Sequence, residues 1–275
     1  MAAVARLAVR RGTALAALLL VAAPVAAQKN VVPDGGLYIV VPSPIDDATL
    51  TRVKKRIADA RSRPPVVVFD FTPSDKDATT PTYGSATELA DFIAGMHDVR
   101  TVAYVQQKVS GHSVLPVLAC KEIVCGPQGA LGAVVSPADP PLGQGALNAY
   151  DRIPRQVRPA YLAVAKKMYD PDVQLRKGKK AGADWYVDLR HRQEAEKEGV
   201  QITDTAPLPN VPDGRVGLFT AAQLRDLGLS RRTFQTREDL FDEFGLNAAA
   251  LHEDPLGGRA AVPFRYVLKG AVDGG

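Results

Sequence analysis

The strongest constraint on the fold is a continuous apolar run, Val66–Phe71, which only Asp70 interrupts. Unbroken runs of β-branched and aromatic residues are typical of strands that are buried on both faces, as in parallel sheets. Shorter runs recur at 37–41, 101–105 and 123–125, and helix-like or turn-like segments separate them. This alternation predicts an α/β fold with a mostly parallel sheet and right-handed crossovers.

The segments after the Val66–Phe71 run carry a helix-start signal. Ser85 is expected to cap a helix, and Glu88, three residues further on, would complete a capping box. The Thr-, Pro-, Ser- and Asp-rich stretch 72–84 and the Gly-, Pro- and Ala-rich stretch 129–150 are both expected to be loops.

The first 27 residues have the pattern of a targeting segment. They contain three arginines and no acidic residue, and the charge-free stretch Gly12–Gln28 is 17 residues long. This is shorter than the roughly 20 residues that span a bilayer. Val25–Ala27 places small residues before a cleavage point at Gln28. We expect a signal peptide and export to the periplasm or the extracellular space, with an uncleaved membrane anchor as the alternative.

The rest of the chain is balanced in charge. Of the 34 lysines and arginines, three lie in this N-terminal segment, which leaves 31 against 30 aspartates and glutamates. A domain dedicated to nucleic-acid binding carries a marked basic excess. We therefore expect no nucleic-acid partner.

The cysteines and histidines show no metal-ligand spacing. Cys120 and Cys125 lie across a predicted corner between a helix and a strand, where the Cα separation that a disulfide requires is seldom met. We expect two buried thiols, and a disulfide stays the alternative because export would permit one. The four histidines are scattered over the chain. No metal site and no cofactor are expected.

Several motifs occur in a recognisable order. Ile45-Asp46 follows the first predicted strand, and Ala119–Val124 joins a helix end to a strand. Gly126–Gly132 has the pattern Gly-Pro-x-x-x-x-Gly, and Leu218–Leu229 closes the series. Together they resemble the ClpP/crotonase superfamily, in particular the membrane-associated serine peptidases of the nodulation-efficiency protein D (NfeD) and signal peptide peptidase A type. The resemblance implies a ClpP/crotonase-like domain over residues 28–250, built from repeated β-β-α units with flanking helices.

The residues that would carry peptidase chemistry depart from this family's pattern. The resemblance places the nucleophile at Gly111, or at His112 with a one-residue shift, and the general base at Arg152. Glycine has no hydroxyl, and an arginine stays protonated and cannot accept a proton. The family's Pro-Gly-Gly turn holds the oxyanion through backbone N–H groups. Here Ser74 and Asp75 replace its glycines, and a carboxylate opposes negative charge.

These departures predict a catalytically degenerate, serine peptidase-like protein that binds a peptide or protein partner, with membrane proteins among the candidates. Ser74, Asp75, Gly111 and His112 would line a groove that holds an extended chain by strand addition. The resemblance also implies a homo-oligomer.

Three alternatives remain open. One is a structural subunit whose sheet edges and helices serve assembly, as in ring-forming relatives. An active serine endopeptidase could use Ser110 or Ser113, which flank the expected nucleophile position, with a base not identified in the sequence. A crotonase-type acyl-CoA enzyme needs only backbone N–H groups and so does not require the serine. It is less favoured, because an exported chain would not meet coenzyme A.

The last 25 residues contain a segment that resembles the first predicted strand and the residues after it. Residues 264–273 resemble 37–46, which predicts a linker and the start of a truncated second repeat over 251–275. The alternative is a terminal strand that joins the first sheet.

Overall fold

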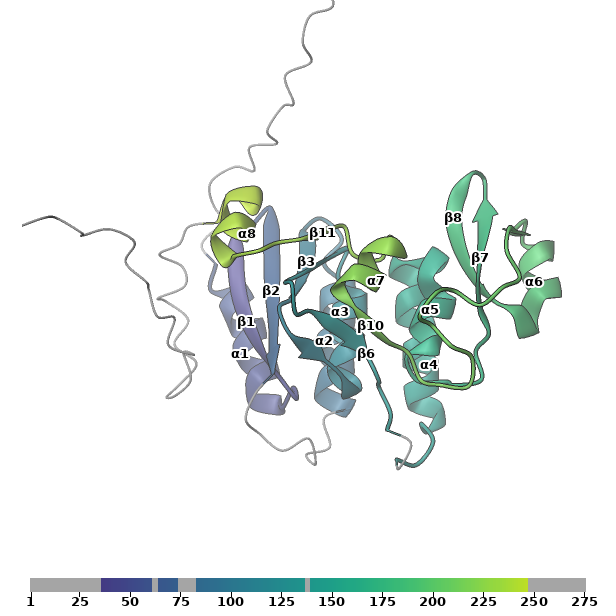
Figure 1. Ribbon diagram of the computed structural model, residues 1–275. Coiled ribbons are helices and arrows are strands. Elements are labelled where there is room, and N and C mark those ends of the chain that lie inside the picture. The colour runs from purple at the N-terminus through teal and green to yellow at the C-terminus, as the bar shows by residue number, and fades with distance from the viewer. Residues whose placement is uncertain (1–35, 61–63, 74–82, 137–138, 247–275) are drawn as a thin grey trace, which may run out of the picture. The chain divides into compact units, whose positions relative to one another are not determined.

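The computed structural model describes residues 36–60, 64–73, 83–136 and 139–246 (Figure 1). Its centre is a sheet in which every neighbouring pair of strands is parallel. The predicted α/β fold with a parallel sheet is therefore confirmed. The strand order is β1 (Leu37–Ser43), β2 (Val66–Pro73), β3 (Arg100–Val105), β5 (Glu122–Cys125) and β11 (Arg232–Thr233).

Three helices cover one face of this sheet. Side chains alternate between the two faces of a strand, and Val67, Phe69 and Phe71 of β2 belong to the core on the helical side. Residues of β1, β3 and β5 complete that core. The covering helices are α1 (Asp47–Ala58), α2 (Tyr83–Ala94) and α3 (Val114–Ala119).

The opposite face is covered near the end of the described chain by α8 (Arg237–Phe244). Val66 and Val68 of β2 pack there with Phe241 and Phe244 in a second, smaller core. A capping box at Thr236 begins the helix, and Gly245 ends it in the left-handed conformation. This short helix and the segment before it therefore cover the second core.

A charged cluster lies inside this second core. The Asp70 carboxylate is fully buried, and its Oδ2 accepts hydrogen bonds from the Tyr38 hydroxyl and, at 2.7 Å, from Arg237 Nη2. Arg237 Nη2 also donates to Gln106 Oε1 at 3.0 Å. Burial raises the pKa of Asp70, while Arg237 and Tyr38 act in the opposite direction. We call these four residues the Asp70 cluster.

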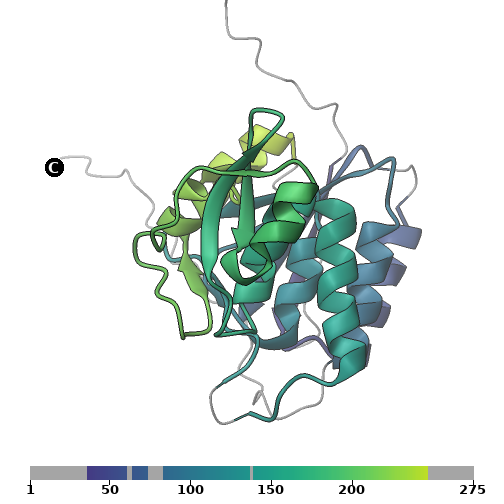
Figure 2. The same ribbon diagram turned by 90° about the vertical axis from the view of Figure 1, so that its right-hand side faces the viewer.

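Two smaller sheets extend the molecule. The first has the order β10 (Leu218–Thr220), β6 (Ala130–Gly132) and β4 (Lys108–Val109); the second has β8 (Ala183–Asp188), β7 (Leu175–Lys180) and β9 (Gln201–Ile202). The same part of the chain forms four further helices, α4 (Gln144–Val157), α5 (Leu162–Lys167), α6 (Arg192–Lys197) and α7 (Ala221–Asp226). Helix α4 contacts α2 and α3 on one side and α5 on the other (Figure 2).

Two local predictions are wrong. Helix α2 begins at Tyr83, so Ser85 lies inside the helix, where its hydroxyl donates to Asp47 on α1 instead of capping. The expected loop over 129–150 contains strand β6 and the start of α4. In α4 the buried residues Ala146, Ala149 and Ile153 recur at helical spacing, which the glycines and prolines before them obscure.

Other predictions concern cysteines and the chain ends. Cys120 and Cys125 are both buried and free, as the favoured interpretation predicted. No helix in the described part of the chain is long and apolar enough to cross a membrane. The expected signal peptide and the expected second repeat fall outside the described residues.

Candidate functional site

The candidate site lies where the parallel strands end. Ligands of open α/β sheets bind beyond the carboxyl ends of the strands, and Ser43 is the last residue of β1. Ser110 follows β4 and leads into a short 3₁₀ turn, η1 (Gly111–Ser113), which continues directly into α3. We call Ser43, Tyr83, Ser110–Ser113 and Tyr150 the turn site.

Gly111 gives this turn its shape. Its φ of +63° lies in the left-handed region, which glycine adopts without a steric penalty. Its N–H donates to the carbonyl of Ala133, just after β6, at 3.1 Å. The backbone N–H at the family's nucleophile position is therefore already hydrogen-bonded and is not available to an oxyanion.

The two serines of the turn have different environments. Ser113 is buried, and the Ser43 hydroxyl donates to its Oγ at 2.7 Å. Ser110 precedes the 3₁₀ turn with extended backbone, and its side chain makes no capping hydrogen bond. Ser113 is thus held by a neutral hydroxyl, whereas no described residue holds the hydroxyl of Ser110.

His112 contacts aromatic residues instead of a serine. Its Nδ1 lies 3.4 Å from the Tyr150 hydroxyl, and its ring meets Tyr83 edge to face at a centroid distance of 5.2 Å. Burial lowers the pKa of His112, which keeps the imidazole neutral at pH 7. Burial also raises the pKa of Tyr150, so the phenol stays protonated.

Arg152, at the family's base position, does not contact the turn site. Its guanidinium pairs with Asp91 of α2 at 2.7 Å, and more than half of the side chain is exposed. The hydrogen bond that Arg152 donates to the Asp91 carboxylate raises the pKa of Arg152 further. This side chain fastens α4 to α2 as a permanent cation.

The site therefore holds hydroxyls and a neutral imidazole without a nucleophile–base contact among the described residues. A seryl nucleophile requires a base within hydrogen-bond reach, and neither Ser110 nor Ser113 has one there. In the same ranges no group of three or more His, Cys, Asp or Glu side chains is placed to hold a metal ion.

The structure brings four of the sequence-predicted residues together, Ser110 to Ser113. Ser74 and Asp75 lie outside the described residues. Sequence reasoning missed Ser43, Tyr83 and Tyr150. Ser43 could have been found as the polar residue that ends a predicted strand, but Tyr150 lay in a stretch interpreted as loop.

No protein-family model and no curated protein sequence match the chain. Solved structures that resemble it include a mutant of the 1510-N membrane-bound stomatin-specific protease, with 10% identity, 76% of this chain and 84% of that chain covered, and a TM-score of 0.42. ClpP1 from Listeria monocytogenes is 12% identical, with 75% of this chain and 94% of that chain covered and a TM-score of 0.38. An enoyl-CoA hydratase from Thermoplasma volcanium is 10% identical, with 77% of this chain and 69% of that chain covered and a TM-score of 0.41.

These neighbours are proteins of the ClpP/crotonase fold. Their identities and TM-scores are low, so the likeness concerns the α/β architecture and indicates neither activity nor ligand for this chain. The closer resemblance to NfeD and signal peptide peptidase A stays a prediction.

Proposed function

We propose that this chain is an exported, serine peptidase-like protein that binds an extended peptide or protein segment at the turn site without cleaving it. The observation that carries the proposal is the state of the serine that begins α3. Ser113 is buried and its hydroxyl is bonded to Ser43, so a substrate carbonyl cannot reach it in this arrangement, and no base among the described residues contacts it.

Strand β4 supports the binding part of the proposal. It is an end strand of its sheet and leads straight into Ser110. The Gln107 carbonyl accepts a hydrogen bond from the backbone N–H of Ala130 on β6. Along a strand, the N–H and carbonyl groups of successive residues point to opposite sides. The N–H and carbonyl of Lys108 therefore face away from β6, and no described residue bonds them. An extended segment that pairs with Lys108 would pass beside the turn.

An active serine endopeptidase is the second candidate, and Ser110 is the observation that favours it. Its hydroxyl is not engaged by a described residue, and it adjoins Gly111 with its left-handed backbone. Burial keeps His112 neutral, as a base must be. A rotation of His112 away from Tyr150 would be required before it could serve Ser110.

A fluorophosphonate probe distinguishes the two candidates. The purified chain is incubated with the probe beside an active serine peptidase, and adducts are located by mass spectrometry. We expect no adduct on this chain while the peptidase is labelled. An adduct at Ser110 that Ser110→Ala abolishes would overturn the non-catalytic proposal and establish the second candidate.

Binding is tested with a fluorescently labelled mixture of random decapeptides, followed by anisotropy. Lys108→Pro removes the N–H that an added strand would use, while Lys108→Ala removes only the side chain. We expect Lys108→Pro to weaken binding at least several-fold and Lys108→Ala to change it little. Equal effects of the two variants, or no binding to the unaltered chain, would contradict strand addition.

A further inference from the structure

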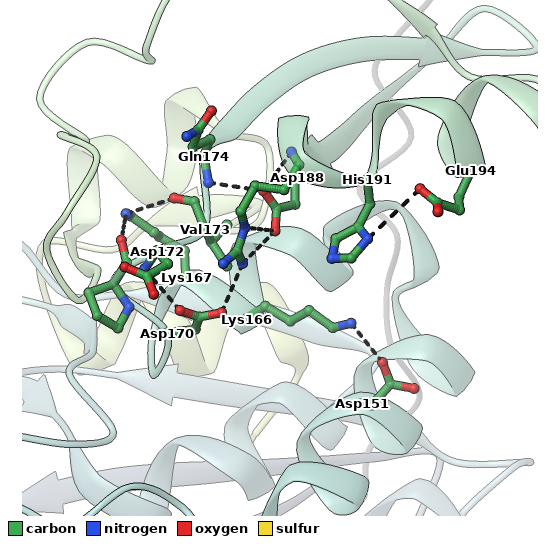
Figure 3. Close-up of polar contacts among 12 residues, drawn as sticks. Asp151, Lys166, Lys167, Asp170, Asp172, Val173, Gln174, Asp188, His191 and Glu194 are labelled. Carbon is green, nitrogen blue, oxygen red and sulfur yellow. Dashed lines mark hydrogen bonds and ion pairs between the residues drawn. The ribbon is translucent and has the colours of Figure 1, made fainter.

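A cleft separates α4 and α5 from the β7–β8 sheet and α6. Its volume is about 380 Å³, within the range of small-ligand and side-chain pockets. Arg155 of α4 and Lys166 of α5 line one wall, and Glu194 and Glu198 line the other. Figure 3 shows Lys166 on one side and His191 with Glu194 on the other. We call this the Trp185 cleft.

The floor of the cleft is apolar. Leu162 and Ala163 of α5 meet Trp185, Tyr186 and Val187 of β8. Trp185 and Leu162 are only partly buried, so an apolar ligand group can still remove surface from water there. The floor therefore favours an apolar side chain over a polar group.

The wall formed by α4 and α5 is positive. Arg155 and Lys166 both pair with Asp151, at 3.1 and 3.0 Å, so two cations share one carboxylate. This wall therefore keeps an excess of positive charge. Lys180, a further cation, belongs to β7 on the other side of the cleft, where its Nζ lies 4.7 Å from the centroid of the Trp185 ring.

The part of the opposite wall formed by α6 and the residue after it is negative. Glu194 lies 3.8 Å from His191, and Glu198 forms no ion pair with a described residue. Asp188, deeper in the cleft, is already occupied by Arg190 at 2.6 Å and by two backbone N–H groups. Glu194 and Glu198 are therefore the carboxylates of this wall that pair with no described lysine or arginine within ion-pair distance.

We infer that the Trp185 cleft is a second binding site, which takes a peptide segment of a partner protein with an apolar side chain between an acidic and a basic residue. The apolar side chain would lie on Leu162 and Trp185. The acidic group would face Lys166 and the basic group would face Glu194 and Glu198, because each wall attracts the opposite charge. The inference goes beyond the proposed function, since the turn site lies on the α2–α3 side of α4.

Trp185 makes the test direct, because it is the only tryptophan of the chain. Its fluorescence is titrated with four blocked pentapeptides, Gly-Glu-Leu-Lys-Gly, Gly-Lys-Leu-Glu-Gly, Gly-Glu-Gly-Lys-Gly and Gly-Glu-Leu-Glu-Gly. We expect a saturable change with at least one of the two dipolar leucine peptides. The peptide without leucine should bind about tenfold more weakly or worse, since it buries no apolar side chain. The doubly acidic peptide should also bind more weakly, because it opposes the two glutamates.

Matched variants assign the charge contribution. Glu194→Gln together with Glu198→Gln should weaken the dipolar peptide about five- to tenfold, while Glu196→Gln on the same helix should leave it unchanged because Glu196 pairs with Arg192. Equal binding of all four peptides, no fluorescence change with any of them, or an equal effect of Glu196→Gln would overturn the inference. None of these outcomes bears on the turn site, which the probe at Ser110 and the variants at Lys108 test separately.

Discussion

The turn site and the Asp70 cluster lie against opposite faces of one parallel sheet, and both hold polar atoms inside a largely apolar molecule. The turn site uses neutral groups, with Ser43 bonded to Ser113 and His112 against Tyr150. The Asp70 cluster uses full charges, a buried carboxylate and a guanidinium.

This difference separates a site that can exchange partners from one that cannot. A neutral hydrogen bond contributes about 1 kcal/mol, and water or a ligand can replace it. A buried charge that loses its counter-ion keeps its full desolvation penalty. The Asp70 cluster is therefore a fixed attachment of α8, and the turn site is the one suited to binding.

The largest effect is expected from breaking the charged cluster. Arg237→Met leaves the Asp70 carboxylate buried without its cation, which should cost about 3–5 kcal/mol of unfolding free energy at pH 8. Without Arg237 the pKa of Asp70 rises further, so the loss should be smaller at pH 5. Urea unfolding at both pH values measures this.

Arg232→Met is the matched control. Arg232 pairs with Glu243 in an exposed position, so its removal should cost less than about 1 kcal/mol. Adding Asp70→Asn to Arg237→Met should recover part of the loss. If the Arg232 and Arg237 variants were equally stable, α8 would not depend on the buried pair.

A smaller effect is expected from the backbone of the turn. Gly111→Ala forces an alanine into a left-handed conformation and should cost about 1–2 kcal/mol. Gly84→Ala is a control for which the stability change should have the opposite sign. An added Cβ meets open space at both glycines, but φ is positive only at Gly111 of the two. In helix α2, Gly84→Ala should stabilise by about 0.5–1 kcal/mol. Thermal unfolding compares the two, and a stabilising Gly111→Ala would contradict the turn geometry.

Replacing the two serines of the turn by alanine should change the unfolding free energy by still smaller amounts. Ser113→Ala removes the bond from Ser43 and should cost about 1 kcal/mol. Ser110→Ala should change stability by less than about 0.5 kcal/mol, because no described contact is lost. In a double-mutant cycle, Ser43→Ala should add little to Ser113→Ala. Additive losses would mean that the two hydroxyls do not interact.

The pH dependence of the two sites should be opposite in sign. Burial lowers the pKa of His112 below about 6.5, the value in an unfolded chain, so between these values only the unfolded chain binds the proton. The turn site therefore loses stability as the pH falls below about 6.5. The pKa of Asp70 is raised, so the folded chain holds this proton more tightly than the unfolded chain does. The contribution of Asp70 to the unfolding free energy therefore falls as the pH rises above about 3.9.

His112→Gln isolates the contribution of the turn site. The variant should lose the part of the pH dependence that belongs to His112, so the stability difference between the two proteins should change between pH 8 and pH 5. Denaturant midpoints at both values measure it. An unchanged difference would mean that His112 titrates as it does in the unfolded chain.

The main sheet could be predicted because its signals are local. Val66–Phe71 is apolar except for Asp70, and 101–105 is apolar after Thr101. Short runs of this kind, rich in β-branched and aromatic residues, are typical of strands buried on both faces. The start of α2 could not be predicted in this way. Ser85 has the preferred residue type for a cap, but it bonds to Asp47 on another helix, and this tertiary contact leaves no mark in the local sequence.

The candidate site was predicted only in part for a related reason. The turn at 110–113 could be located because its motif lies between a strand and a short apolar helix. Its partners come from elsewhere in the chain, with Ser43 70 residues and Tyr150 38 residues away from the groups they contact. Asp70 was visible as the one polar residue in a buried run, but Arg237 is 167 residues distant.

The late position of α8 has a consequence for biosynthesis. Strands β1, β2, β3 and β5 are complete once Cys125 has emerged from the ribosome, whereas α8 begins only at Arg237. Until then Val66, Val68, Val102 and Val124 have no cover from α8 in the nascent chain. Transiently uncovered apolar surface of this kind promotes aggregation. A holding chaperone would therefore be of most use to this protein in the interval before its last described helix is made.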